Sequence, residues 1–261
     1  MLKKRFITAV ISLAILLAVL FVAPAQIAEA VIALVIIGGA WEWSRFLQTE
    51  SNALQFGYLV IVAVLMALFA GPLAEYGVIV LQVALVWWLA AFVWTFFYPT
   101  PIPPPVRWLI GVLVLVPAYL ALIELYRISA VMLLFSLLIV WAADMGAYFA
   151  GKAFGKVKLA PMVSPGKTWE GVLGGLVLVV LLTVGMSFVF EFNLASMVPF
   201  CLAVAVISIV GDLTVSMFKR TTGMKDSGSL FPGHGGVLDR IDSVTAAAPL
   251  FALGAGWLGL S

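Results

Sequence analysis

The sequence predicts an all-α integral membrane protein, a polytopic bundle of about nine transmembrane helices. Hydrophobic residues make up 64% of the 261 positions and charged residues only 10%, whereas soluble proteins carry about 25% charged residues. Apolar runs also recur along the whole chain, and about 20 apolar residues let a helix cross the hydrocarbon core of a bilayer. Most side chains therefore have to face lipid or one another.

The candidate spans are separated by residues that end helices. The apolar runs lie near residues 6–23, 27–43, 54–70, 76–97, 106–123, 129–150, 171–190, 194–217 and 243–260. Gly71-Pro72, a proline-rich stretch at 99–105, and Pro161 and Pro165 in a long polar loop fall between runs, where a helix cannot continue.

The spans group into two regions. Residues 1–128 hold about five helices, and residues 129–261 form a C-terminal region with polar loops at 151–170 and 218–242. The first apolar run follows three basic residues and resembles a signal peptide. It is nevertheless long enough to span a bilayer and more spans follow, so we interpret it as a retained first helix.

Basic residues fall almost entirely on one side of this predicted bundle. If the N-terminus is cytoplasmic, Arg127 is the only one of the 14 Lys and Arg residues on the outer side. Cytoplasmic loops of membrane proteins carry the excess of positive charge. We therefore expect the N-terminus and both polar loops in the cytoplasm. Isolated acids on the outer side, such as Glu29, are expected to be solvated loop charges.

Composition also excludes some classes of partner and site. A formal net charge of +2, with basic residues scattered among apolar runs, does not form a nucleic-acid surface. The single cysteine, Cys201, rules out an internal disulfide. One cysteine and one histidine do not make a zinc site of the usual kind. We interpret Cys201 as a small buried apolar residue.

The densest polar segment runs from Ser216 to Asp242. It contains four basic residues, three acids and the only histidine of the chain. A charge at the centre of a membrane helix costs about 3 kcal/mol even on the mildest insertion scale, so this segment is expected to face a wet cavity. Glycines recur among its polar groups, which a merely solvated loop does not require. The segment is therefore the candidate active site.

Three aspartates predict a magnesium site. Asp239 and Asp242 share one face if the last helix begins there. Asp212 lies one turn before Ser216 and two turns before Lys219, so an acid, a hydroxyl and an ammonium follow one helical stripe. Carboxylates that leave positions open for water and phosphate oxygens are the usual Mg²⁺ ligands. We predict Mg²⁺ at Asp212, Asp239 and Asp242, and leave open a second cation.

Four cations predict a polyphosphate substrate. Lys219, Arg220, Lys225 and Arg240 supply the charge that a nucleoside triphosphate needs, with Arg able to hold phosphate bidentately. His234 has two readings. It either orients phosphate or protonates a leaving group, or it is a hydrogen-bonded loop residue.

The polar loop at 151–170 follows Asp144 and is expected to cover the site from the same side. We interpret Asp144, Lys167, Thr168 and Glu170 as nucleotide or headgroup contacts, against the alternative of a plain positive-inside loop. Residues 165–168 look like the end of a P-loop. However, Pro161 stands where that motif needs glycine, and no strand is expected before it.

The polar segment resembles the signature of phosphatidate cytidylyltransferases, or CDP-diacylglycerol synthases, at every defined position. These positions are Ser216, Phe218, Lys219-Arg220, Lys225-Asp226, Gly228, Phe231-Pro232, His234-Gly235-Gly236-Val237 and Asp239-Arg240-Ile241-Asp242. Asp144, Ser164-Pro165 and residues 167–171 are also similar to that family. Gly166 departs from it, since a larger polar residue is expected there. The resemblance covers roughly the C-terminal half.

The resemblance implies Mg²⁺-dependent transfer of the cytidylyl group of CTP to phosphatidic acid, giving CDP-diacylglycerol and pyrophosphate. It implies that the three aspartates hold metal, that the four cations hold phosphates, and that Asp226 orients a metal-bound water or a cation. Ser164 and Ser216 join the expected substrate contacts. A homodimer in a bacterial plasma membrane is also expected.

Three other functions remain as alternatives. A CTP-dependent lipid kinase uses a comparable cluster to phosphorylate an alcohol such as a polyprenol, and it releases CDP. A transporter is suggested by the number of spans and by intramembrane acids such as Asp212. The charges gather at one face, however, and do not line a path across the membrane. An intramembrane protease is weaker, because no second aspartate motif accompanies Asp212.

Overall fold

The computed structural model describes residues 2–188, 190–228 and 235–258, and it confirms the all-α class. Nine α-helices occur in these ranges: α1 (Leu2–Phe21), α2 (Ala25–Ser44), α3 (Asn52–Ala70), α4 (Gly77–Thr95), α5 (Pro104–Ile128), α6 (Ala130–Phe154), α7 (Trp169–Met186), α8 (Leu194–Thr221) and α9 (Leu238–Trp257). Each corresponds to one predicted apolar run. Two short 3-10 helices, η1 (Arg45–Leu47) and η2 (Ala74–Tyr76), lie between them.

Helix ends follow the capping chemistry of the sequence. Ser51, Ser129 and Asn193 each precede a helix and accept a hydrogen bond from a backbone N–H of its first turn, which satisfies one of the donors left unpaired there. Pro104 opens α5 at the one position where a helix tolerates proline well. The breaks between the apolar runs are therefore set locally.

Seven helices of the described chain, α2 to α8, are long and apolar enough to cross a membrane. The apolar stretch found in α1, Val10–Phe21, is shorter than the length required of a spanning helix. Charged residues occupy the first turns of α9. The predicted total of nine spans therefore stays a prediction.

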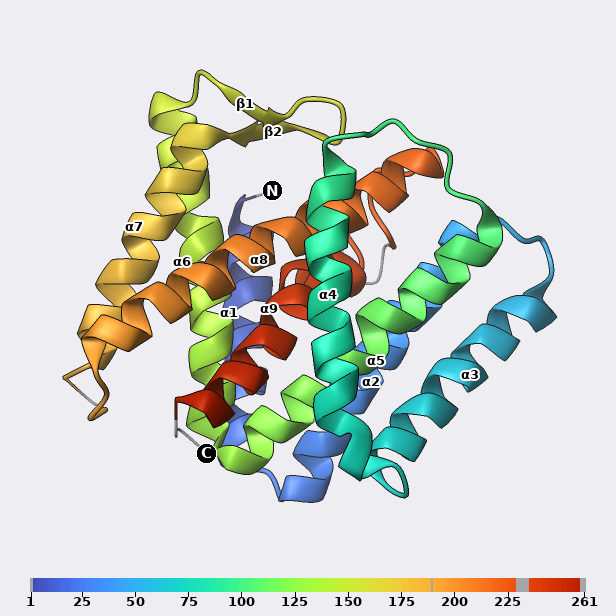
Figure 1. The fold of residues 1–261 in the computed structure, drawn as a ribbon, viewed down its shortest axis with the longest axis horizontal. Coiled ribbons are helices and arrows are strands. Elements are labelled where there is room, and N and C mark those ends of the chain that lie inside the picture. The colour runs from blue at the N-terminus through green and yellow to red at the C-terminus, as the bar shows by residue number, and fades with distance from the viewer. Residues whose placement is uncertain (1, 189, 229–234, 259–261) are drawn as a thin grey trace.

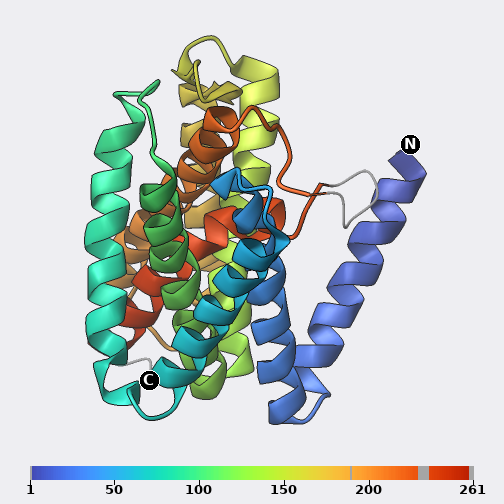
Figure 2. The same cartoon turned by 90° about the vertical axis from the view of Figure 1, so that its right-hand side faces the viewer.

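Helix α9 lies in the middle of the bundle (Figure 1) and packs against α8, α5, α4, α6 and α2. Most of its residues are buried, and many are small, including three consecutive alanines, Ala246 to Ala248. Small side chains let helices approach closely within a membrane, where packing drives association. By contrast, α1 leans away from the other helices (Figure 2). The helix that carries two of the predicted site aspartates is thus held on several sides.

The polar loop between α6 and α7 forms a β-hairpin, which the sequence did not indicate. Strands β1 (Lys158–Ala160) and β2 (Ser164–Thr168) pair antiparallel, with Lys158 opposite Thr168 and Ala160 opposite Ser164. The expectation that no strand lies here was wrong. The strands are too short for an alternating pattern to be visible in the sequence.

Polar contacts join the helix ends at one end of the bundle. At the start of α5, Arg107 donates to the Phe46 carbonyl at 2.9 Å, next to the end of α2. At the end of α8, Arg220 Nε donates to the Val163 carbonyl of the hairpin turn at 3.2 Å. In Figure 1 the hairpin lies at the top of the molecule, on the same side as these helix ends. The hairpin loop and the polar segment that begins at the end of α8 are therefore neighbours.

The opposite end carries an ion pair. Arg127 Nε donates to Glu29 Oε1 at 2.9 Å, which joins the end of α5 to the start of α2. The expectation that Glu29 stands alone was wrong, although the pair is exposed to solvent in part. Sequence reasoning missed the pair because the two residues lie in different predicted loops.

Candidate active site

The candidate site lies where α8 passes α9. A Cβ atom added to Gly211 would come within 2.6 Å of the Asp242 carbonyl oxygen and 2.8 Å of Ala246 Cβ, so only glycine allows this crossing. Next to it, Asp212, Lys219, Asp239, Asp242 and the hairpin residue Lys167 form a group that we call the aspartate–lysine cluster.

Lys219 links α8 to both aspartates of α9. Its Nζ lies 2.7 Å from Asp239 Oδ1 and 3.9 Å from Asp242 Oδ2. One ammonium touches both carboxylates because residues three apart share a helix face, so the predicted alignment of Asp239 and Asp242 is confirmed. Lys219 is buried. A buried ammonium requires such partners, since an unpaired charge away from water is very costly.

Asp212 forms the other part of the cluster. Ser216 Oγ donates to its Oδ1 at 3.1 Å, as the predicted helical stripe requires. Its Oδ2 pairs with Lys167 Nζ at 2.6 Å. Asp212 is also close enough to Lys219 and Asp242 to interact with them electrostatically. The hairpin therefore contributes a cation to the same site as α8 and α9.

Asp239 forms hydrogen bonds with the backbone of the segment that precedes α9. Its Oδ2 accepts hydrogen bonds from the backbone N–H groups of Ser227 and Gly236, each at 2.9 Å. Its other oxygen faces Lys219. Asp239 thus binds backbone groups on both sides of residues 229–234.

The chemistry of the cluster fits a hard divalent cation. Three carboxyl groups lie together with two ammonium groups. Carboxylate oxygens are donors of the kind that Mg²⁺ prefers. Within the described ranges, no three His, Cys, Asp or Glu side chains are arranged as a ready metal site. Asp212 and Asp239 are instead paired with separate lysines. For Asp212 and Asp239 to hold a metal ion together, the lysines would have to give up part of these contacts.

The three other predicted phosphate-binding cations, Arg220, Lys225 and Arg240, are exposed, and so is the acid Asp226. Their charges are therefore accessible to a ligand. Arg220 also donates to the Met224 carbonyl at 3.4 Å. The prediction for His234 falls outside the described residues.

Two of the remaining predicted contacts in and near the hairpin, Thr168 and Glu170, have local partners. Thr168 accepts a hydrogen bond from Gly171 N–H at 3.2 Å and caps α7. Glu170 accepts from Val157 N–H at 3.2 Å. Ser164 lies at the start of β2. Asp144 of α6 is exposed and lies within electrostatic reach of Lys167 and Asp212. Lys167 and Asp144 therefore come near the cluster, whereas Thr168 and Glu170 order the hairpin.

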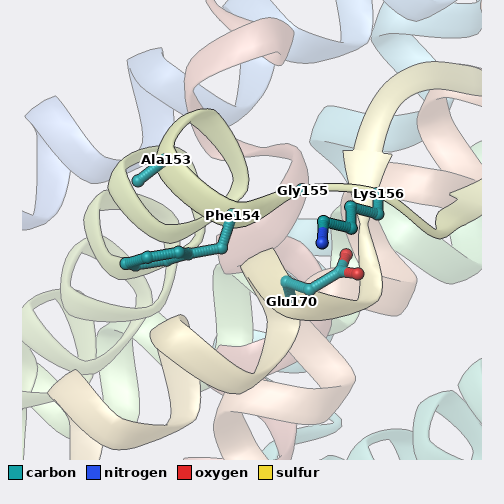
Figure 3. Close-up of a pocket in the computed structure, with 5 residues that line it drawn as sticks. All are labelled: Ala153, Phe154, Gly155, Lys156 and Glu170. Carbon is teal, nitrogen blue, oxygen red and sulfur yellow. The ribbon is translucent and has the colours of Figure 1, made fainter.

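A pocket of about 530 Å³ lies beside the hairpin, where α6 ends and α7 begins. It is lined by Ala153, Phe154, Gly155, Lys156 and Glu170. In Figure 3 the side chains of Lys156 and Glu170 point toward one another, while Phe154 points away from them. None of the cluster residues lines this pocket. We place the site at the cluster because charge is concentrated there.

Sequence reasoning missed two buried polar residues beside the cluster, Glu42 of α2 and Ser227. Ser227 Oγ donates to Glu42 Oε2 at 2.7 Å. A signal was present for Glu42, because a carboxylate in an apolar run is expensive to bury without a purpose. Ser227 gave none, since it lies between defined positions of the signature.

Comparison with known proteins extends the similarity over nearly the whole chain. The model of the cytidylyltransferase family matches residues 3–255. A phosphatidate cytidylyltransferase from Pseudomonas aeruginosa is 45% identical over 98% of this chain and 99% of its own length. A phosphatidate cytidylyltransferase from Haemophilus influenzae is 38% identical over 97% of this chain and 98% of its own length. One from Staphylococcus haemolyticus is 46% identical over 45% of this chain and 46% of its own length. The two longer matches include the N-terminal helices.

Proposed function

This chain belongs to the cytidylyltransferase family, and we propose that it transfers the cytidylyl group of CTP to phosphatidic acid. The products are CDP-diacylglycerol, which enters phospholipid synthesis, and pyrophosphate. The similarity to phosphatidate cytidylyltransferases over nearly the full length carries this proposal. The aspartate–lysine cluster supplies a site with the charge that the reaction needs.

The reaction requires positioning and neutralisation more than covalent help from the protein. A phosphate oxygen of the lipid attacks the α-phosphorus of CTP, and the bond from that phosphorus to the bridging oxygen of the β-phosphate breaks. Pyrophosphate leaves with the electron pair of that bond. The nucleophile is already an anion, so no serine or cysteine has to be activated. Catalysis then rests on alignment and on stabilising the charge of the leaving group.

The cations have two kinds of position in this scheme. Lys167 and Lys219 lie within the cluster, where a phosphate that binds to them would displace an aspartate contact. Arg220, Lys225 and Arg240 are exposed, and in this scheme they attract and hold the triphosphate. Asp226, beside Lys225, orients a cation or a metal-bound water. For His234 both interpretations stay open: a residue that contacts or protonates phosphate, or a hydrogen-bonded loop residue.

We propose that Asp212, Asp239 and Asp242 hold Mg²⁺. When bound, the ion neutralises charge on the phosphates of CTP. The three carboxylates and Lys219 are brought together by α8 and α9, so the fold itself fixes their spacing. A second cation is compatible with the same set of oxygens.

The hairpin is the proposed cover of the site. Its Lys167 reaches Asp212, and Arg220 reaches back to the hairpin turn. Asp144, Ser164, Thr168, Ser216 and Glu170 are the remaining proposed substrate contacts. Thr168 and Glu170 act in this scheme by ordering the strand that carries Lys167.

The protein is an integral membrane protein, and we propose that it lies in the plasma membrane of a bacterium as a homodimer. The relatives are bacterial. The distribution of Lys and Arg supports a cytoplasmic position for the N-terminus and the site. CTP is present on that side, and phosphatidic acid reaches the site from the bilayer.

Labelled CTP tests the proposal. Purified protein in detergent is incubated with phosphatidic acid, Mg²⁺ and CTP labelled either at the α- or at the γ-phosphate. The α-label should enter a lipid product and the γ-label should appear in pyrophosphate. In a parallel reaction with a polyprenol in place of phosphatidic acid, a lipid kinase would instead transfer the γ-label to the alcohol and release CDP, and that result would replace the proposed activity.

A further inference from the structure

Glu42 is a buried carboxylate near the end of α2, only 3% exposed. Among the residues that the structure describes, three that lie far away in the sequence donate hydrogen bonds to it. Ser227 Oγ donates at 2.7 Å, Val237 N–H at 2.9 Å and Leu238 N–H at 2.8 Å. Hydrogen bonds to an ionised group are roughly twice as strong as neutral ones. The carboxylate therefore ties an N-terminal helix firmly to the segment that enters α9.

The start of α9 needs a partner of this kind. The first N–H groups of a helix have no acceptor within the helix, and Val237, at the N-cap position, provides no side-chain cap. Glu42 supplies the missing acceptor from another helix. Its negative charge also lies at the positive end of the helix dipole. One side chain thus satisfies donors that α9 leaves open.

Ser227 is held on all its polar atoms. Its N–H donates to Asp239, its hydroxyl donates to Glu42, and its carbonyl accepts from Arg45 Nη1 at 3.4 Å. It is fully buried. Glu42 and Arg45 come from one turn of chain at the end of α2, while Asp239 belongs to α9. The end of α2 and the start of η1 therefore bind the polar segment through Ser227.

Two glycines of the segment make room for Glu42. A Cβ at Gly228 would come within 2.7 Å of Glu42 Cδ, and a Cβ at Gly236 would overlap the same carboxylate. Carbon atoms do not approach so closely without a shift of one of them. The absence of side chains at these positions follows from the close approach of Glu42.

We propose that Glu42 is a positioning residue of the active site. It acts through Ser227 and the first residues of α9, and it sets the placement of Asp239 and Asp242 relative to Lys219. Asp239 shares Ser227 with Glu42, so a shift of Ser227 changes the contacts of both carboxylates. The N-terminal helices therefore contribute to the chemistry of the site.

Three variants test the proposal. Glu42→Gln keeps the shape but turns one acceptor into an NH₂ donor that faces other donors. Ser227→Ala removes a single hydroxyl. Glu50→Gln is the matched control, because Glu50 is exposed in the connection that follows η1. Turnover of CTP is measured per folded molecule, and amide hydrogen exchange is measured on peptides from each helix.

We expect Glu42→Gln to lower turnover by about 10- to 100-fold, the range typical of residues that orient a metal-binding shell. Exchange at Val237 and Leu238 should quicken, while α6 and α7 keep the protection of the wild type. Ser227→Ala should lose less activity. The double variant should be no worse than Glu42→Gln alone, because the hydroxyl acts through the carboxylate. Glu50→Gln should match the wild type.

Wild-type turnover in Glu42→Gln would overturn the proposal, as would additive losses or faster exchange throughout the bundle. If Glu42→Gln does not fold, Ser227→Ala decides: it must lower turnover and speed exchange around residue 227, and unchanged values refute the role. Only the turnover measurement rests on the proposed function. Hydrogen exchange needs no substrate, so a wild type inactive toward CTP would refute that function and leave the link from Glu42 to α9 testable.

Discussion

Lys167 Nζ lies 2.6 Å from Asp212 Oδ2, an ion pair that ties the β1–β2 hairpin to α8. Both side chains are partly exposed, about a quarter each, so the pair is accessible to a ligand. A substrate phosphate that takes over Lys167 would release Asp212 for another cation. We therefore expect the position of the hairpin to depend on whether substrate is bound.

Lys167→Met should lower turnover by about tenfold or more, because it removes a phosphate-binding charge and breaks the ion pair of Asp212. Lys158→Met is the control, since Lys158 is exposed on the neighbouring strand. The measurement is the initial rate over a range of CTP concentrations. Equal rates in the two variants would remove Lys167 from the site.

Lys219→Met should destabilise the folded protein by about 3 kcal/mol or more, because it leaves the buried Asp242 and the partly buried Asp239 without their shared cation. Lys219→Arg keeps the charge and should retain more of the stability. Thermal unfolding in detergent measures both. If the two variants melt at the same temperature, the charge of Lys219 is not what holds α8 and α9 together here.

Glu29→Gln should change stability by less than about 1 kcal/mol, because exposed ion pairs contribute little. Its partner Arg127 is more than half exposed. Turnover should stay at the wild-type value, since the pair lies at the end of the bundle away from the cluster. A large loss of activity would show that this end also takes part in the reaction.

Mg²⁺ should raise the melting temperature of the wild type even without CTP, because a ligand that binds the folded state stabilises it. The gain is about 2.7 kcal/mol at a hundred times the dissociation constant. Asp242→Asn should lose this shift. An equal shift in the variant would place the ion elsewhere.

The helices were predictable because most apolar runs are long and several begin at a capping or helix-breaking residue, as at Ser51 and Pro104. The alignment of Asp239 with Asp242, and of Asp212 with Ser216, followed from helical spacing alone. These features depend on residues close together in the sequence.

Contacts between distant segments were not predictable in the same way. Glu42 lies 185 residues before Ser227, and nothing local indicates that the two meet. The hairpin was missed because its strands are only three and five residues long. The pairing of Lys167 with Asp212 depends on that hairpin, so the sequence predicted both residues but not their contact.

The central claim is that the aspartates of the cluster serve CTP chemistry at the membrane. It is tested most directly by Asp239→Asn, with Glu191→Gln at an exposed position as the matched control. Conversion of CTP and phosphatidic acid to CDP-diacylglycerol is measured on purified, folded protein. We predict that Asp239→Asn loses this conversion while Glu191→Gln keeps it. Wild-type rates in Asp239→Asn would contradict the account.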